Sequence, residues 1–378
     1  MTIFVDARLL TKERSTGIEE YTRLLVDHLL KLDQKNKYVF FYNGFQKVPF
    51  PDEWRKSNVR VIESRIPNKA LELSLRLFHF PCAERFAKCD IYFSPHLNLL
   101  RTRDDKKRVL IFHDLSFEYY PEFFPLRKQF WHWEQDIRAE ARRAGRVVAV
   151  SDFTRATLLE RFRLRAEHVV TIRSGVDPFY KPIERKDAVH AHSDPFILTV
   201  GTLEPRKNIP LAIAAFHHLK EKQNVKNLKL IVAGSSGWLS GSIEKEIAAS
   251  PWRRDIIIRK DVSRDVLRIF YNTARAFLYP SFFEGFGFPP LEAQACGLPV
   301  VASNRASLPE ILGASACLVD PWRVEEAVEA LHALLTDGAF YERYRALGFE
   351  NVRRFRWEDT ARQFLTLFDQ LHAGKETP

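Results

Sequence analysis

The sequence predicts an α/β protein made of two doubly wound, Rossmann-like domains that face a cleft. Short apolar runs alternate with longer stretches of helical spacing, which is typical of parallel sheets covered by helices. At 378 residues the chain is too long for one ordinary core. The alternation stops at a polar stretch, residues 177–195, and then starts again, so this stretch is expected to be a linker. We therefore expect one domain over residues 1–180 and a second over 194–355, followed by an amphipathic segment, 356–378, that could pack on either.

Expected elements of the first domain follow the spacing of its apolar residues. Helical spacing predicts a helix over residues 17–32. Short apolar runs predict strands at residues 1–7, 38–43, 59–64, 90–95, 108–114 and 146–151.

The second domain repeats this pattern, with clearer signals for where its helices begin. Ser263 is expected to be an N-cap, and Ser307 with Glu310 fits a capping box before a short helix. Pro321 suits the first position of the helix that follows. Strands are expected at 195–201, 228–236, 255–260, 275–281, 298–303 and 316–321, and helices at 208–222, 262–274 and 289–296.

Composition predicts a cytoplasmic, globular protein. Apolar residues make up 46% of the chain and charged residues 28%. No apolar run is long enough for a transmembrane helix, and the N-terminus, with Asp6 near its start, does not resemble a signal peptide. The four cysteines form neither a CxxC pair nor a zinc-type spacing, so we expect reduced, structural thiols.

The net charge of +10 lies mainly in the first half of the chain. Residues 1–180 hold 32 Lys and Arg against 24 Asp and Glu, a net of +8, and the remainder has a net of +2. An anionic partner for the first half is one interpretation, such as nucleic acid, a membrane surface or a phosphorylated acceptor, and a solvated basic surface is the other. Basic and aromatic residues alternate within 124–146, but no nucleic-acid motif accompanies them.

The segment EGFGF, residues 284–288, is the most informative in the chain. It is expected to connect a strand to the next helix, where doubly wound sheets bind ligands. Glycines allow backbone N–H groups to approach an anion, so Gly285, Phe286 and Gly287 are candidates for a phosphate cradle, with Phe288 completing the loop. A dinucleotide site fits poorly, because Pro290 stands where a third glycine would be expected.

Two glutamates, Glu284 and Glu292, flank this turn. A carboxylate repels phosphate but accepts hydrogen bonds from vicinal hydroxyls, so ribose and sugar diols are natural partners. Together with the phosphate cradle, the pair indicates a nucleotide diphosphate with a sugar at each end. The alternative is that both are surface residues of a loop and a capped helix.

A second basic loop is expected at the same edge of the same sheet. Arg206 and Lys207 follow the strand that ends at Gly201. Two adjacent cations there can neutralise a diphosphate leaving group, since charge-assisted hydrogen bonds contribute about 1.5–3 kcal/mol each. A solvated pair at a helix start is the competing interpretation.

In the first domain, His113 and Asp114 end a buried strand, and Gly17 opens the first helix. The histidine is a candidate for a reacting centre or an ordinary satisfied loop residue. Gly17 could let an acceptor approach the backbone or serve only as a turn residue. No D-x-D, P-loop, HExxH or GxSxG motif occurs, so nothing indicates a metal-clamped or serine-nucleophile site.

Together these segments resemble the retaining glycosyltransferases of family 4, which have the GT-B fold. EGFGFPPLE is similar to the E-x7-E motif of the family, with Glu284 and Glu292 at its ends. The segments VGTLEPRKN and IFHDLSFEYYPEFF are most similar to mannosyltransferases of surface-polysaccharide assembly. Further similar segments are VVAVSDFTRATLLERF, TIRSGVDPFYKP, GLPVVASNRASLPEILGASACLVDP and RFRWEDTARQFLTLF, the last resembling a helix that crosses back to the first domain.

This resemblance implies roles for both glutamates. Glu284 would hold hydroxyls of the donor sugar and Glu292 the ribose, while the backbone of 285–287 binds the diphosphate. Retention would follow a front-face course, in which a donor phosphate oxygen takes the proton of the acceptor. No metal cofactor is implied. One departure is that Thr202 follows Gly201 where many members have arginine, so Arg206 is expected to substitute.

His113 would lie near the transferred sugar, and Gly17 and Asp114 would contribute to acceptor binding. The expected donor is GDP-mannose, with UDP- and dTDP-sugars as alternatives. The expected acceptor is a saccharide or lipid-linked glycan, reached from the cytoplasm with peripheral contact at the inner face of the membrane. Competing interpretations are a nucleotide-sugar epimerase of the same fold and a basic, non-enzymatic binding protein.

Overall fold

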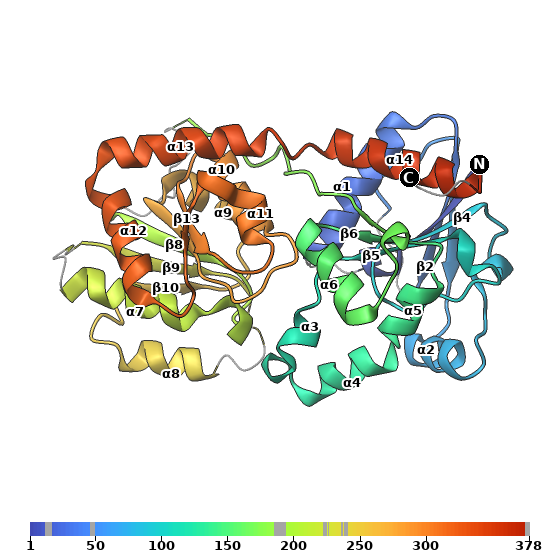
Figure 1. The fold of residues 1–378 in the computed structure, drawn as a ribbon, viewed down its shortest axis with the longest axis horizontal. Coiled ribbons are helices and arrows are strands. Elements are labelled where there is room, and N and C mark those ends of the chain that lie inside the picture. Colours follow the sequence, from blue (N-terminus) through green and yellow to red (C-terminus); the bar gives the residue numbers. More distant parts are fainter. Residues whose placement is uncertain are drawn as a thin grey trace. The chain divides into compact units, whose positions relative to one another are not determined.

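The computed structural model describes residues 1–11, 17–45, 50–184, 194–221, 225, 227–235, 237 and 241–374, and divides them into two compact units (Figure 1). Unit 1 comprises Met1–Leu115, Leu126–Gly175 and Arg356–Pro378, and unit 2 comprises Ser116–Pro125 and Val176–Phe355. The division differs from the expected boundaries in that residues 116–125 group with unit 2 and the change of unit falls after residue 175 rather than 180.

Unit 1 is built on a seven-stranded sheet with the order β3-β2-β1-β4-β5-β6-β7, in which all pairings are parallel. Strands β4 and β5 are buried along their whole length, as is expected of a sheet covered on both faces. Its elements are β1 (Thr2–Asp6), α1 (Gly17–Leu32), β2 (Lys37–Asn43), β3 (Val59–Ser64), α2 (Asn68–Leu77), β4 (Ile91–Ser94), β5 (Arg108–Phe112), α4 (Leu126–Glu134), α5 (Ile137–Arg143), β6 (Arg146–Ala149), α6 (Asp152–Phe162), β7 (Val169–Thr171) and α14 (Trp357–His372).

The C-terminal helix α14 is part of unit 1 and packs along α1 (Figure 1). Trp357 at its start is 1% exposed, with its ring centroid 5.4 Å from that of Tyr21 and 6.1 Å from that of His28. Gly175 lies so close that a Cβ there would be 2.3 Å from the backbone nitrogen of Trp357. The amphipathic pattern of α14 is therefore explained by burial of its apolar face on α1.

Unit 2 contains a six-stranded parallel sheet with the order β10-β9-β8-β11-β12-β13. Numbered within the unit, this order is 3-2-1-4-5-6, that of dinucleotide-binding folds. Its elements are α3 (Ser116–Tyr119), β8 (Phe196–Val200), α7 (Ile209–Glu221), β9 (Lys229–Ala233), α8 (Gly241–Ala249), β10 (Ile256–Arg259), α9 (Arg264–Thr273), β11 (Ala276–Tyr279), α10 (Phe288–Ala295), β12 (Val300–Ser303), α11 (Leu308–Leu312), β13 (Cys317–Val319), α12 (Val324–Thr336) and α13 (Gly338–Val352).

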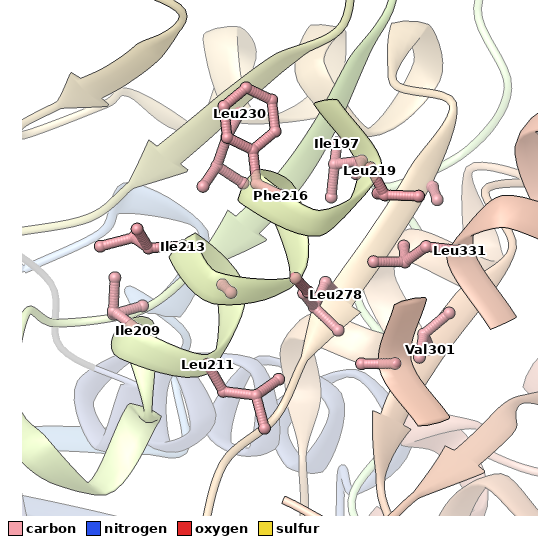
Figure 2. Packing of buried hydrophobic residues seen from close by; sticks show 14 of the residues in the cluster. Ile197, Ile209, Leu211, Ile213, Phe216, Leu219, Leu230, Leu278, Val301 and Leu331 are labelled. Carbon is pink, nitrogen blue, oxygen red and sulfur yellow. The ribbon is translucent and has the colours of Figure 1, made fainter. Parts of the chain in front are cut away.

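One face of this sheet is covered by α7 and α12, which contact each other. Ile213 and Phe216 of α7 pack toward the strand residues Leu230 and Leu278, with Leu331 of α12 beside them (Figure 2). Each fully buried aliphatic or aromatic side chain of this kind contributes about 1.5–3 kcal/mol relative to exposure. On the other face, α10 contacts α9 and α13. This core fixes the carboxyl ends of β8 and β11.

The expected α/β architecture is confirmed, with two details wrong. Ser307 precedes α11, but its side chain makes no capping bond to that helix. Pro321 does not begin the next helix, because α12 starts at Val324. Ser263 is an N-cap as expected, since its hydroxyl accepts a hydrogen bond from the Val266 backbone N–H. Among the described helices, none is both long and apolar enough to span a membrane.

Candidate functional site

The loops after β8 and β11 carry the residues that the sequence marks as candidates in unit 2. These two strands are neighbours, and the strand order reverses between them. In doubly wound sheets such a reversal leaves an opening at the carboxyl edge, where ligands bind. Arg206 and Lys207 lie in a short 3₁₀ turn, Pro205–Lys207, after β8, and residues 284–287 lie between β11 and α10. The fold therefore brings both predicted loops together at one place.

Five side chains at this edge form what we call the Glu284 cluster: Glu204, Arg206, Lys207, Tyr279 and Glu284. The Lys207 ammonium is 2.6 Å from Glu284 Oε1, and Arg206 Nη1 is 3.0 Å from Glu284 Oε2. The Tyr279 hydroxyl donates to Glu284 Oε1 at 2.9 Å. On the other side of the Arg206 guanidinium, Nη2 lies 2.7 Å from Glu204 Oε1. Both oxygens of Glu284 are thus held by cations or a hydroxyl.

Burial and charge act in opposite directions on the cluster. Burial raises the pKa of Glu284, but the adjacent Arg206 and Lys207 outweigh it and lower the pKa to about 2. Burial lowers the pKa of Lys207, and the Glu284 carboxylate opposes that change. Glu284 is therefore ionised at neutral pH while only 7% exposed, which is tolerated because two cations pair with it.

Sequence reasoning missed Glu204 and Tyr279 as members of the cluster. Glu204 lies two residues before Arg206 in LEPRKN, a spacing that could have indicated a local ion pair. Tyr279 ends a buried strand and carries a hydroxyl that needs a partner, since its ring is 1% exposed. Lys207 Nζ donates to that hydroxyl at 2.7 Å, so the tyrosine links lysine and carboxylate.

Ser307 holds the EGFGF turn in shape. Its hydroxyl lies 2.9 Å from the Glu284 carbonyl oxygen and 3.0 Å from that of Phe286. Gly287 has a φ of 107°, which favours glycine, and a Cβ there would lie 2.7 Å from Leu308 Cδ2. Phe288 is already the first residue of α10 rather than a loop residue. The turn is therefore fixed from α11, not only by its own glycines.

Glu292 lies on α10, one turn after Phe288, and is partly buried. The Tyr271 hydroxyl donates to Glu292 Oε2 at 3.0 Å. Tyr271 is 1% exposed, and burial together with this carboxylate raises its pKa well above the ordinary value. A neutral tyrosine therefore orients the Glu292 carboxylate, and it was not among the predicted residues.

The departure at Thr202 leaves no arginine beside Gly201. The Thr202 hydroxyl is 3.5 Å from that of Ser235, and the Lys207 side chain runs past Gly201, 3.1 Å from a Cβ placed there. Arg206, the expected substitute, forms ion pairs with Glu204 and Glu284 in this structure. Its contact with a donor phosphate stays a prediction.

In unit 1, His113 follows β5 and is held by the backbone. Its Nε2 lies 2.8 Å from the Pro95 carbonyl oxygen, which can only accept, so this nitrogen carries the proton. Its ring centroid is 4.6 Å from that of Tyr21. Burial lowers the pKa of His113 to about 4, against the effects of the Pro95 carbonyl and Asp114. At neutral pH the imidazole is uncharged, with Nδ1 as an acceptor.

Gly17 is a further candidate position of unit 1, and the end of β1 carries a buried ionic group that was not among the candidates. Gly17 begins α1, and no atom of the described residues lies within 4 Å of a Cβ placed there, so their packing does not require glycine. Asp6 at the end of β1 is fully buried, 2.6 Å from Arg8 Nη2 and 3.5 Å from His96 Nε2. This ionic group follows the two strands, β1 and β4, between which the strand order reverses. In the sequence, only the polar residues of the segment VDAR could have indicated this buried ionic group.

His113 should titrate near pH 4, which NMR of the imidazole can measure. Because this pKa is below the ordinary value of about 6.5, the folded state prefers the neutral ring. The resulting stabilisation is present above about pH 6.5 and is lost as the pH falls through 4. His113→Gln should lack this pH-dependent part of the free energy of unfolding. A measured pKa at or above 6.5 would contradict the burial argument.

Within the described residues, no group of three or more His, Cys, Asp or Glu side chains is placed to hold a metal ion.

Two glycosyltransferase family models match this chain. Residues 15–179 match the model named Glycosyltransferase Family 4, and residues 181–350 match Glycosyl transferases group 1. The chain is 28% identical over 372 residues to O-antigen chain mannosyltransferase B of Escherichia coli, covering 94% of this chain and 96% of that protein. It is 30% identical over 274 residues, 70% of this chain, to the serotype-specific mannosyltransferase WbdA of Escherichia coli, of which it spans 34%.

Solved structures show the same fold. Sucrose-phosphate synthase from Thermosynechococcus elongatus superposes with a TM-score of 0.78 at 21% identity, over 99% of this chain and 100% of that one. Anabaena Alr3699/HepE in complex with UDP and glucose gives a TM-score of 0.71 at 17% identity, over 97% and 99%. The expected GT-B fold is thus confirmed. The two family matches together cover most of the chain, and the protein belongs to the glycosyltransferases, with a family 4 domain followed by a group 1 domain.

Proposed function

We propose that this glycosyltransferase moves mannose from GDP-mannose onto a saccharide or lipid-linked glycan during surface-polysaccharide assembly, with retention of configuration and without a metal ion. The main support for the proposal is that Glu284 and Glu292 flank the EGFGF turn, where the strand order of the unit 2 sheet reverses. The choice of mannose is supported by the names of the E. coli relatives. UDP- and dTDP-sugars are the alternative donors.

Each residue of the site has a task in this proposal. Glu284, ionised and held by Tyr279, accepts hydrogen bonds from hydroxyls of the donor sugar. Glu292, oriented by Tyr271, accepts from the ribose. The backbone of residues 285–287 contacts the diphosphate.

Arg206 and Lys207 offset the charge of the departing nucleoside diphosphate. Their present partner, Glu284, keeps both cations at the reacting edge. Because a donor phosphate oxygen takes the proton of the acceptor hydroxyl, no protein nucleophile is needed. The roles of His113, Asp114 and Gly17 near the transferred sugar and acceptor stay predictions from the family resemblance.

A donor screen tests the proposal directly. Purified protein should release nucleoside diphosphate from GDP-mannose faster than from UDP- or dTDP-sugars, and should do so unchanged in excess EDTA. Activity that is lost in EDTA and restored only by magnesium or manganese would contradict metal independence. Interconversion of a nucleotide sugar without release of the nucleotide would indicate the epimerase, and no turnover of any donor would favour a binding protein.

Peripheral membrane contact is part of the same proposal. At the start of α4, Leu126 is 81% exposed and Phe130 54% exposed, with the exposed cations Arg127 and Lys128 between them. An exposed apolar residue beside cations suits an anionic membrane surface, where each Lys or Arg near the surface contributes about 1 kcal/mol. The cytoplasmic location itself stays a prediction from the sequence.

Vesicle flotation should show more protein on anionic than on neutral vesicles at low salt, and the Leu126→Ser and Phe130→Ser double variant should float less. The matched control is Val61→Ser, an exposed apolar residue of β3, which should float as the wild type does. Equal partitioning of the wild type to neutral and anionic vesicles would contradict membrane contact.

A further inference from the structure

A basic hollow lies at the edge of the unit 1 sheet opposite to the edge that carries His113. Lys106 precedes β5, Arg146 opens β6, and His168 precedes β7, so the amino ends of three adjacent strands meet there. The hollow has a volume of about 640 Å³, within the range of small-molecule sites. It belongs entirely to unit 1.

The lining of this hollow is strongly cationic. Among the described residues that line it are six Arg and Lys side chains and His168, but no carboxylate. Two of the cations have carboxylate partners just outside it: Arg143 lies 3.2 Å from Glu140 and Arg165 lies 3.2 Å from Glu167. The six are Lys106, Arg142, Arg143, Arg146, Arg163 and Arg165.

Local packing holds this concentration of charge in place. A Cβ at Gly145 would be 1.9 Å from the Lys106 carbonyl oxygen, so glycine allows the two basic segments to approach. Arg142 donates to the Phe162 carbonyl oxygen at 3.2 Å, which ties α5 to the end of α6. Arg146 is partly buried, and its Nε has no hydrogen-bond partner among the described residues. Like charges are thus assembled at a cost in repulsion.

We propose that this hollow is a binding site for a phosphate-bearing anion with at least two negative charges, such as a diphosphate or the head group of a phospholipid. Several guanidinium groups can donate paired hydrogen bonds to phosphate oxygens, and arginine is the side chain best suited to this geometry. The anion would occupy the position where the repulsion between the cations is largest.

This site is separate from the reacting centre. Along β5, Arg108 at its start is four residues from Phe112 at its end, and strands rise about 3.3 Å per residue. A ligand in the hollow therefore lies more than about 10 Å from the carboxyl edge of the sheet. We expect it to anchor the protein or a phosphorylated partner molecule without taking part in sugar transfer.

Isothermal titration with inorganic pyrophosphate tests the site, with excess GDP present so that a nucleotide site in unit 2 is occupied. The double variant Arg163→Gln and Arg165→Gln should bind at least about tenfold more weakly, since two charge-assisted contacts are lost. The charge-keeping variant with lysine at both positions should retain most of the affinity. The matched control is Arg60→Gln with Arg65→Gln, two exposed arginines of the same unit outside the hollow.

Vesicles of phosphatidylcholine with cardiolipin distinguish the source of the phosphate, with all variants made in the Leu126→Ser, Phe130→Ser background so that α4 does not contribute to flotation. If the glutamine variant loses pyrophosphate binding but floats normally, the ligand is a free phosphate compound. If it also loses flotation, and pyrophosphate competes with the vesicles, the ligand is a lipid head group. If the Arg163/Arg165 and Arg60/Arg65 variants lose binding equally, or neither loses any, the hollow is only part of a general basic surface and the proposal is wrong. Unaltered thermal unfolding of each variant excludes misfolding as the cause.

Discussion

Glu284→Ala should lower kcat by about 100-fold or more, whereas Glu292→Ala should mainly raise the KM for the donor. In the proposed mechanism Glu284 contacts the sugar being transferred, whose geometry and charge change during the reaction. Alanine therefore removes a contact that positions this sugar in the transition state. Glu292 contacts the ribose, far from the reacting bond, and such binding is similar in the ground and transition states. Steady-state kinetics of the two variants measures both effects.

Nucleotide titration is the control for this pair of variants. Free nucleoside diphosphate should bind the Glu284 variant nearly as well as wild type and the Glu292 variant more weakly. Because alanine at 284 leaves Lys207 buried without its carboxylate, a cost of about 3–5 kcal/mol in stability is expected. Glu284→Gln, which keeps the shape, should therefore be compared as well. Equal loss of nucleotide affinity in both variants, with kcat unchanged, would show that the two glutamates do not bind opposite ends of the donor.

Gly175→Ala should destabilise the protein by about 3 kcal/mol or more, the upper range for overpacking. The added Cβ would lie 2.3 Å from the Trp357 backbone nitrogen and 2.5 Å from its Cγ. Neither atom can move without displacing the start of α14, whose buried indole packs on Tyr21 and His28. Urea denaturation measures the change in the free energy of unfolding.

Gly44→Ala is the matched control in the same unit, because no atom in the described part of the chain lies within 4 Å of a Cβ there. It should change stability by less than about 1 kcal/mol, through the unfolded chain. Equal urea midpoints for the two variants would mean that α14 can shift away from residue 175 without cost.

Most of the fold could be predicted from the sequence because its strands are short apolar runs and its helices have clear periodicity. The helix at 17–32 and the strand at 59–64 were predicted with their observed bounds. Strand β7, Val169–Thr171, was missed, since three residues carry too little periodicity. The capping box at Ser307 was wrong because a tertiary partner, the EGFGF turn, takes its hydroxyl.

The candidate site was predictable as far as its residues lie in compact motifs. EGFGF and the Arg206–Lys207 pair each mark a loop, and parallel topology brings those loops to one edge. The sequence could not show which side chains far apart in the chain contact each other, because these contacts depend on the strand order. Tyr271 lies 21 residues from its partner Glu292, and Lys207 lies 77 residues from Glu284. The roles assigned to these residues stay predictions.

The hold of Ser307 on the EGFGF turn has a consequence for exchanging segments between related enzymes. A donor loop transplanted as residues 284–292 alone would leave behind the Ser307 hydroxyl that fixes two of its carbonyl oxygens and the Leu308 side chain that lies beside Gly287. The smallest piece that carries its own shape runs from the start of β11 at Ala276 to Leu308. A chimaera that changes sugar preference in this family should be cut at those two positions.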